Sequence, residues 1–286
     1  MAAPWPDEIV GGMETVIMDT RLGKQHPTLR RVRDLRRDPR LRREQGVFVA
    51  EGLHLAEEAL ASRASIELVL YSERLTEHDA GRALLDRIVA ADLERAEVAD
   101  TVLAALQDAR SPQPVLTLAR RRDTTLEACL SAVGPHPLFV VAHGIQDPGN
   151  LGGLWRTADA AGAAALFVTG ESADPYHPRT VRATMGSVFR LAAVATDVEA
   201  ATAAFRRAGL TTLATTPSAS TDYHAATFTS GCAVYFGGEG AGLPGPVLAA
   251  MDACVRIPMR GGVESLSVGA AAAVVLFEAA HQRARA

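Results

Sequence analysis

The chain has 286 residues, of which 48% are hydrophobic and 22% charged, and its formal net charge is −4. This composition is typical of a globular protein and excludes a disordered or fibrous chain. At roughly 150 residues per domain, the length predicts about two domains.

Positive charge is concentrated near the N-terminus. Residues 21 to 43 include ten basic residues against two acidic ones, although acidic residues outnumber basic ones in the whole chain. This asymmetry indicates a polyanionic partner that binds near one end, with a solvated helix face as the simpler alternative. Of the 29 basic residues, 28 are arginine. Arginine suits bidentate phosphate contacts, although codon bias would give the same ratio.

The cysteines and the apolar runs point to a cytosolic location. The three cysteines (Cys129, Cys232 and Cys254) are far apart and form no CxxC pattern, which argues against a disulfide framework and a structural zinc site. The longest uncharged apolar run, residues 265–277, is shorter than the about 20 residues needed to span a bilayer. The N-terminus lacks the pattern of a signal peptide. We therefore expect a cytoplasmic protein with reduced thiols and no metal.

The first half of the sequence predicts a small α/β domain over residues 21–118. Residues 1–20 have no period and are expected to be a flexible lead-in. A helix is predicted over 28–44, broken near Pro39, because Leu29, Val32 and Leu35 repeat every third residue among arginines. There follow a strand at 47–52, a helix at 53–62, a strand at 66–72, helices at 79–91 and 98–106, and a strand at 114–119.

Residues 119–137 resemble a linker, and a second α/β pattern fills residues 138–286. Strands are expected at 138–144, 165–170, 189–194, 210–216, 233–238 and 254–259. Helices are expected at 154–162, 179–187, 197–208, 244–251 and 265–283. Continuous apolar strands that alternate with helices predict a mostly parallel sheet with helices on both faces.

Three glycine-rich segments, residues 145–163, 236–243 and 257–269, each follow one of these strands. The carboxyl ends of parallel strands lie at one edge of a sheet, where ligands bind, and glycine lets the backbone approach a ligand closely. One such loop alone is more simply a tight turn, but three at one edge favour a pocket. No GxxxxGK[ST] or helix-opening GxGxxG pattern is present, so a nucleotide phosphate site is not indicated.

In this order and spacing, the three segments resemble the signature motifs of the SpoU (TrmH-like) branch of the SPOUT methyltransferases. Residues 181–194 resemble the segment that this branch carries between its first two motifs. More weakly, residues 42–52 and 106–119 resemble the small N-terminal domain, similar to ribosomal protein L30e, of the ribosomal-RNA members. The resemblance implies methyl transfer from S-adenosylmethionine to a ribose 2′-hydroxyl of RNA, a deep C-terminal trefoil knot and a homodimer built around it.

The same resemblance places Asn150 and Arg156 at the catalytic positions of the first motif. Deprotonating an arginine side chain is costly, so we expect Arg156 to clamp a phosphate and stabilise the developing alkoxide rather than act as a base. A surface pair with Asp159 is the alternative. Asn150 either orients the hydroxyl or holds the turn.

Glu239 matches the glutamate of the second motif, which anchors the loop or positions substrate. Ser267 stands where the family usually has asparagine, a change that predicts lower turnover or a different substrate geometry. The cofactor is expected to be held mainly by main-chain groups at Thr215, Gly237, Gly238, Ile257, Met259 and Leu266. Without the resemblance, Ile257 and Leu266 would be interpreted as core residues.

Phosphate contacts are expected from Arg30, Arg31, Arg33, Arg36, Arg37, Arg179 and Arg182. His143, His177 and His224 are potential bases by residue type, but each is more simply a hydrogen-bonded loop histidine.

We therefore expect an RNA 2′-O-ribose methyltransferase, dimeric and cytosolic, with ribosomal RNA favoured over transfer RNA because of the L30e-like domain. A knotted RNA-binding protein without activity, with Ser267 as a sign of decay, is one alternative. A methyltransferase of a small molecule is the other, for which the basic N-terminal helix would have no use.

Overall fold

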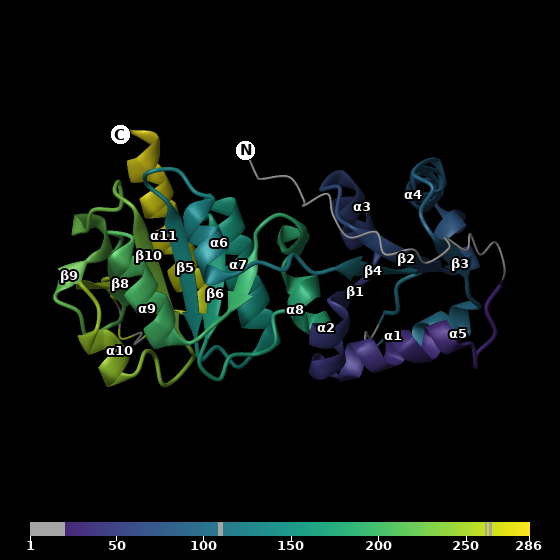
Figure 1. Cartoon of the computed structure of the whole chain (residues 1–286), viewed down its shortest axis with the longest axis horizontal. Coiled ribbons are helices and arrows are strands. Elements are labelled where there is room, and N and C mark those ends of the chain that lie inside the picture. Colours follow the sequence, from purple (N-terminus) through teal and green to yellow (C-terminus); the bar gives the residue numbers. More distant parts are fainter. Residues whose placement is uncertain (1–20, 108–110, 261, 263–264) are drawn as a thin grey trace. The chain divides into compact units, whose positions relative to one another are not determined.

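The computed structural model describes residues 21–107, 111–260, 262 and 265–286 (Figure 1). The expected lead-in, residues 1–20, lies outside these ranges. The chain divides into two units, one formed by the residues up to 123 together with 176–189, and the other by 124–175 and 190–286. No helix in the described ranges is both long and apolar enough to cross a membrane.

The described part of the first unit contains a four-stranded sheet in the order β1-β4-β2-β3. Strand β4 pairs antiparallel with β1 and β2, and β2 pairs parallel with β3. The strands are β1 (Val47–Glu51), β2 (Ile66–Tyr71), β3 (Arg95–Glu97) and β4 (Val115–Arg120). The helices are α1 (Pro27–Arg37), α2 (Pro39–Gln45), α3 (Leu53–Ala61), α4 (Asp79–Ala90), α5 (Asp100–Ala105) and α8 (Pro178–Ala183).

Asp38 produces the helix break that the sequence predicts near Pro39. Its backbone N–H donates to the carbonyl of Asp34 and closes α1. Its carboxylate accepts from the N–H groups of Arg40 and Leu41, so the same residue caps the start of α2. Proline fits the first helical position because that position needs no N–H donor. The prediction of two consecutive helices is confirmed.

Arg36, expected to bind RNA, is buried instead. Its guanidinium lies 2.9 Å from the carboxylate of Glu51 on β1, and the two side chains are only 6% and 1% exposed. The reason is helical spacing: Arg36 follows Leu29 by seven residues and Val32 by four, so it lies on the same buried stripe. Arg31 is also engaged, because it is half-buried and pairs with Glu67.

Replacing Arg36 should therefore affect folding rather than RNA binding alone. Arg36→Ala leaves the Glu51 carboxylate buried without its closest partner, so we expect the free energy of unfolding to fall by about 3 kcal/mol. Arg30→Ala, at an exposed position of α1, should change it by less than about 0.5 kcal/mol. Urea denaturation followed by circular dichroism measures both. Equal stability of the two variants would contradict a structural role for Arg36.

The segment 176–189 belongs to the first unit, although in sequence it interrupts the second. The ring of Phe48 on β1 contacts Tyr176 at 5.2 Å and Phe189 at 5.9 Å, so both ends of the segment meet one side chain. Helix α8 packs against β1 between these contacts. The helix expected over 179–187 ends at Ala183, and a 3₁₀ turn at Ser187–Phe189 replaces the start of the strand expected at 189–194. The domain limits expected from the sequence, 21–118, 119–137 and 138–286, place residues 176–189 in the second domain, whereas the structure groups them with the first unit.

The described part of the second unit contains a seven-stranded sheet in the order β7-β6-β5-β10-β8-β11-β9, and all its strand pairs are parallel. The strands are β5 (Leu138–His143), β6 (Ala165–Thr169), β7 (Ala193–Ala195), β8 (Thr211–Thr215), β9 (Thr221–Asp222), β10 (Cys232–Gly237) and β11 (Ala253–Arg256). The helices are α6 (Leu126–Ser131), α7 (Pro148–Ala160), α9 (Val198–Arg207), α10 (Gly245–Ala249) and α11 (Val268–Ala284).

The strand order places a switch point between β5 and β10. From β5 the sheet continues through β6 and β7 on one side, and β10, β8 and β11 lie on the other. Connections that leave in opposite directions open a crevice at the carboxyl ends of the two central strands, and this is where parallel sheets bind ligands. The expected mostly parallel sheet is confirmed.

Helix α7 begins six residues earlier than expected, at Pro148 rather than at residue 154. The carboxylate of Asp147 accepts from the N–H of Asn150 at 3.0 Å and caps the helix, and Pro148 occupies the first position. These start signals outweigh the poor helix propensity of Gly149, Gly152 and Gly153. The Asn-Leu-Gly-Gly sequence is therefore helical, not the turn that we expected.

Candidate functional site

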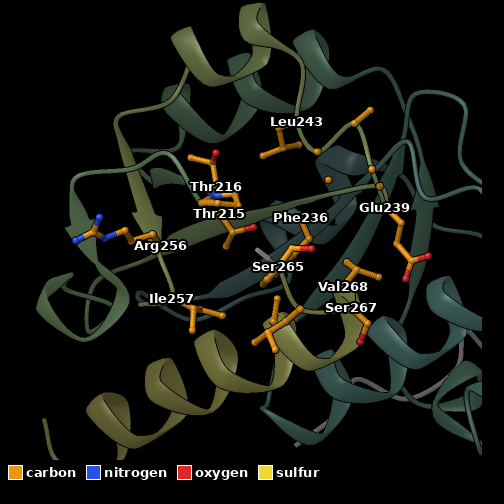
Figure 2. A pocket seen from close by; sticks show the side chains of 18 of the residues that line it. Thr215, Thr216, Phe236, Glu239, Leu243, Arg256, Ile257, Ser265, Ser267 and Val268 are labelled. Atoms are coloured by element: carbon orange, nitrogen blue, oxygen red, sulfur yellow. The ribbon is translucent and has the colours of Figure 1, made fainter. Parts of the chain in front are cut away.

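A pocket of about 550 Å³ opens in the second unit beyond the carboxyl ends of β8, β10 and β11 (Figure 2). Its volume is within the range of roughly 300–1,000 Å³ found for small-molecule sites. All six residues expected to hold a cofactor line it: Thr215, Gly237, Gly238, Ile257, Met259 and Leu266. Glu239 and Ser267 line it as well, and in Figure 2 they lie on the side away from Arg256.

The loop after β10 can adopt its fold only because two consecutive residues lack side chains. A Cβ at Gly237 would lie 2.3 Å from the carbonyl carbon of Gly242, since the loop folds back on itself through a hydrogen bond from Gly242 N–H to the Gly238 carbonyl. A Cβ at Gly238 would lie 2.1 Å from the carbonyl oxygen of Gly144. Both clashes involve backbone atoms, so no side-chain rotation relieves them.

The contact between Gly238 and Gly144 links the pocket to the chain just before the first glycine-rich segment. Gly144 follows β5, and the hydroxyl of Ser172 accepts from the next N–H, that of Ile145, at 3.0 Å. The loop after β5 therefore contacts the pocket wall without lining the pocket. We expected all three segments to enclose a ligand, but only the second and third contribute lining residues, and residues 261, 263 and 264 of the third lie outside the described ranges.

Apolar side chains face this pocket without being covered. Leu266 is 39% exposed, which is unusual for a large apolar residue, and Ile257 is half-buried beyond the end of β11. The Thr215 hydroxyl donates to the Tyr235 carbonyl at 2.9 Å, so it ties β8 to β10. Uncovered leucine and isoleucine beside backbone polar groups suit a ligand with a flat, partly apolar ring system.

Ser267 has a defined structural role at the pocket rim. It is the N-cap of α11, where its hydroxyl accepts from the N–H of Ala270 at 3.3 Å. Serine and asparagine are nearly equivalent N-cap residues. The departure from the family pattern therefore keeps the helix start, which the sequence pattern alone could not reveal.

Asn150 and Arg156 do not line this pocket, although the sequence pattern placed them at the site. Both lie on α7, where Arg156 is exposed and its side chain has no hydrogen-bond or ion-pair partner among the described residues. The alternative pairing of Arg156 with Asp159 is wrong, since Asp159 pairs with Arg190 at 2.9 Å. Arg156 is thus a cation available to an anion outside the described chain.

The three histidines have structural contacts and none lines the pocket. His143 shares a hydrogen bond with the Thr169 hydroxyl at 3.0 Å, and burial lowers its pKa although Glu199 opposes this shift. His177 caps α8 by accepting from the N–H of Arg179. His224 packs edge-on against Tyr223.

Sequence reasoning did not single out several other lining residues. Phe236, Leu243 and Ser265 lie inside the glycine-rich segments, whereas Thr216 and Arg256 lie outside them. Arg256 is fixed by a 2.7 Å ion pair with Asp222 on the neighbouring strand β9, a two-residue strand too short for a sequence signal. Across the described ranges, no group of three or more His, Cys, Asp or Glu side chains is placed to hold a metal ion.

A basic surface lies on α1 and α2 in the first unit. Five arginines there have guanidinium groups with no hydrogen-bond or ion-pair partner in the part of the chain that the structure describes: Arg30, Arg33, Arg37, Arg40 and Arg43. Arg33 is half-buried and the other four are exposed. The three on α1 follow the spacing i, i+3, i+7 and so share one helix face. We call these five residues the basic face.

Comparisons with known proteins identify the family. A model of the SpoU rRNA Methylase family matches residues 137–277, and one of an MRM3-like substrate binding domain matches residues 26–117. An uncharacterised tRNA/rRNA methyltransferase from Synechocystis is 32% identical over 261 residues, which cover 91% of this chain and 92% of that protein. The chain belongs to the SpoU rRNA methylase family. The family that the three glycine-rich segments indicated is confirmed.

Two solved structures extend this likeness over most of the chain. An AdoMet-bound rRNA methyltransferase from Sinorhizobium meliloti matches with a TM-score of 0.78 at 30% identity and covers 92% of this chain and 97% of its own. The SpoU methyltransferase AviRb from Streptomyces viridochromogenes, in complex with the cofactor AdoMet, matches with a TM-score of 0.79 at 28% identity, over 91% and 99% of the two chains.

Gly238 provides a direct test of the pocket. Gly238→Ala should weaken binding of S-adenosylmethionine, the expected cofactor, by about tenfold or more, because the new methyl group displaces the loop from Gly144. Gly245→Ala is the matched control, since that glycine starts the nearby helix α10 and a Cβ added there would meet no atom within 4 Å. Isothermal titration calorimetry measures both affinities. Unchanged binding by the Gly238 variant would show that this loop is not the cofactor site.

Proposed function

We propose that this SpoU-family protein transfers a methyl group from S-adenosylmethionine to a ribose 2′-hydroxyl of ribosomal RNA. The observation that carries this proposal is the pocket at the carboxyl ends of β8, β10 and β11, whose glycine loop leaves room for a ligand against bare backbone. Ribosomal RNA is favoured over transfer RNA by the names of related proteins. One is the 23S rRNA (guanosine(2553)-2′-O)-methyltransferase RlmP of Bacillus subtilis, 27% identical over 82% of this chain and 89% of that protein.

The pocket residues suit this cofactor. Main-chain groups at Gly237, Gly238 and Met259 would hold its polar edges, and Ile257 and Leu266 would cover the adenine ring. The sulfonium supplies an already activated methyl group, so the protein needs only to align the reacting atoms within roughly 3–3.5 Å and exclude water. Glu239 is exposed at the rim and is proposed to position the RNA or to anchor the loop.

Arg156 is proposed to bind the phosphate next to the target ribose and to stabilise the alkoxide as the hydroxyl loses its proton. A guanidinium stays charged at any physiological pH, so it acts as an electrostatic clamp rather than as a base. The exposure of Arg156 and its lack of a described partner support this role. Asn150, which precedes it on α7, is proposed to orient the hydroxyl.

RNA binding is assigned to the first unit, which matches the MRM3-like substrate binding domain. We propose that the basic face contacts phosphates, with Arg30, Arg33 and Arg37 retained from the expected set and Arg31 and Arg36 removed from it by their ion pairs. We also propose the following domains: one similar to ribosomal protein L30e over residues 21–118, a linker at 119–137, and a knotted methyltransferase domain over 138–286. Within the last range, residues 176–189 pack on the first unit.

A cytoplasmic homodimer through the second unit is also proposed. Helix α11 buries Val275 and Leu276 but leaves Phe277 50% exposed, with Ala273 and Val274 half-buried beside it. Residues 270, 273, 274 and 277 follow the helical spacing of a single apolar stripe. A second copy of the chain would cover this stripe.

The proposed activity predicts methylation of ribosomal RNA that depends on Arg156. With labelled S-adenosylmethionine and rRNA, Arg156→Ala should lower the turnover rate by about 100-fold or more, with cofactor affinity unchanged. Arg207→Ala, also exposed and without a described partner in the second unit, is the control and should retain full activity. Mapping ribose methylation on ribosomal and transfer RNA identifies the substrate. Cofactor binding without methyl incorporation into any RNA would instead favour an RNA-binding protein without activity. Methyl incorporation into a small molecule but into no RNA would favour a small-molecule methyltransferase.

Variants of Ser267 test whether this residue serves as a helix cap or marks a loss of catalytic function. Ser267→Ala should lower the free energy of unfolding by about 1 kcal/mol, whereas Ser267→Asn should change it by only a few tenths, because both serine and asparagine cap a helix such as α11. Thermal denaturation measures the stability of both variants. A rise in turnover of about tenfold or more in Ser267→Asn would contradict this interpretation and indicate a catalytic defect in the natural chain.

A further inference from the structure

The segment 176–189 exposes three large side chains in a regular row. Arg179, Arg182 and Met185 are spaced three residues apart and are all exposed. The residues around them are mostly buried against the first unit: Tyr176, Pro178, Thr180, Val181, Thr184 and Gly186 to Phe189. The segment therefore has one face that packs and one narrow ridge, which we call the 179–185 ridge.

Met185 is held in a conformation that most residues avoid. Its φ angle is +49°, in the left-handed region, and its side chain is 40% exposed. A bulky residue without a stabilising local hydrogen bond from its own side chain is uncommon in this region, where glycine or asparagine is preferred. The backbone conformation directs a flexible apolar side chain away from the packed face.

The turn that carries Met185 is fixed on several sides. Its carbonyl is within 3.3 Å of His54 Nε2 on α3, and its N–H donates to the carbonyl of Arg182. The preceding residue, Thr184, is fully buried and its hydroxyl donates to the Val181 carbonyl. The following residue, Gly186, lies so close to Glu58 that a Cβ there would be 2.5 Å from its carboxylate. The exposed methionine thus projects from a rigid base.

The guanidinium of Arg182, the residue before Met185 on the ridge, is also held in place. Arg182 lies 3.4 Å from the carboxylate of Glu51, which also pairs with the buried Arg36. The Glu51 side chain is 1% exposed, whereas that of Arg182 is 46% exposed. One carboxylate shared by two guanidinium groups leaves positive charge in excess, and the exposed part of Arg182 presents that charge beside Met185.

We propose that the 179–185 ridge is a nucleotide-binding element of the RNA site, in which Arg182 contacts a phosphate and Met185 stacks against an unpaired nucleobase. This inference rests on the proposed function and assigns to Met185 a role that the arginines cannot fill. Specific RNA recognition uses splayed, unstacked bases, and methionine both inserts beside bases in nucleic-acid complexes and makes favourable sulfur–aromatic contacts. Charge complementarity favours RNA over an apolar protein partner, because the ridge pairs its one apolar side chain with two arginines.

The experiment measures binding of an rRNA fragment that the protein methylates, at several salt concentrations, for the full-length chain. Met185→Gly removes the side chain and also relieves the left-handed strain, so the fold should be retained or stabilised. We expect its RNA affinity to fall about fivefold, with the slope of log affinity against log salt unchanged, because stacking releases no counterions. Arg182→Gln should instead reduce the magnitude of that slope by about one.

Val89→Ala is the matched control, since Val89 on α4 is 47% exposed and apolar but lies outside the ridge. It should bind RNA as the natural chain does. A 2-aminopurine at the contacted base should change its fluorescence on binding to the natural chain, and this change should be smaller with Met185→Gly. If the natural chain methylates rRNA but Met185→Gly matches it in affinity and fluorescence, the ridge proposal fails while the proposed function stands. If the natural chain neither binds nor methylates rRNA, the proposed function itself fails.

Discussion

The close approach of two loop backbones, at Gly238 and Gly144, is the constraint on which the site depends. It joins the loop after β10 to the loop after β5, across the switch point of the parallel sheet. Because the two loops meet through bare backbone, the loop after β10 can turn back and leave a pocket in front of it. The third glycine-rich segment and the cap of α11 then close the other side. The pocket is therefore formed mostly by chain geometry and little by charged side chains, as a cofactor that brings its own reactivity requires.

The arginines divide into two groups with different functions. Arg36 and Arg42 are buried: Arg36 pairs with Glu51, and Arg42 donates to the carbonyls of Leu35 and Arg36. The basic face, by contrast, lacks carboxylate partners among the described residues. The excess of positive charge at the surface is therefore smaller than the residue count suggests. The charge that remains there is that of the basic face. Glu51 pairs with both the buried Arg36 and the exposed Arg182, which belongs to the 179–185 ridge and not to the basic face.

Local patterns in the sequence predicted most of the fold and the pocket. Helix and strand alternation predicted the parallel sheet, and all six residues expected to hold the cofactor line the pocket. The failures have physical causes. Helix α7 begins at capping residues that the glycines concealed, and Arg36 lies on a buried stripe that its charge concealed. The packing of 176–189 on the first unit depends on long-range aromatic contacts with Phe48, which no local period encodes.

The most direct test of the central claim is amide hydrogen exchange of the natural chain with and without S-adenosylmethionine. If the glycine loops hold the cofactor, exchange should slow at residues 237–243 and 265–268 and remain unchanged on the basic face of the first unit. Protection that is absent from both loops, or that is confined to another part of the chain, would contradict the account.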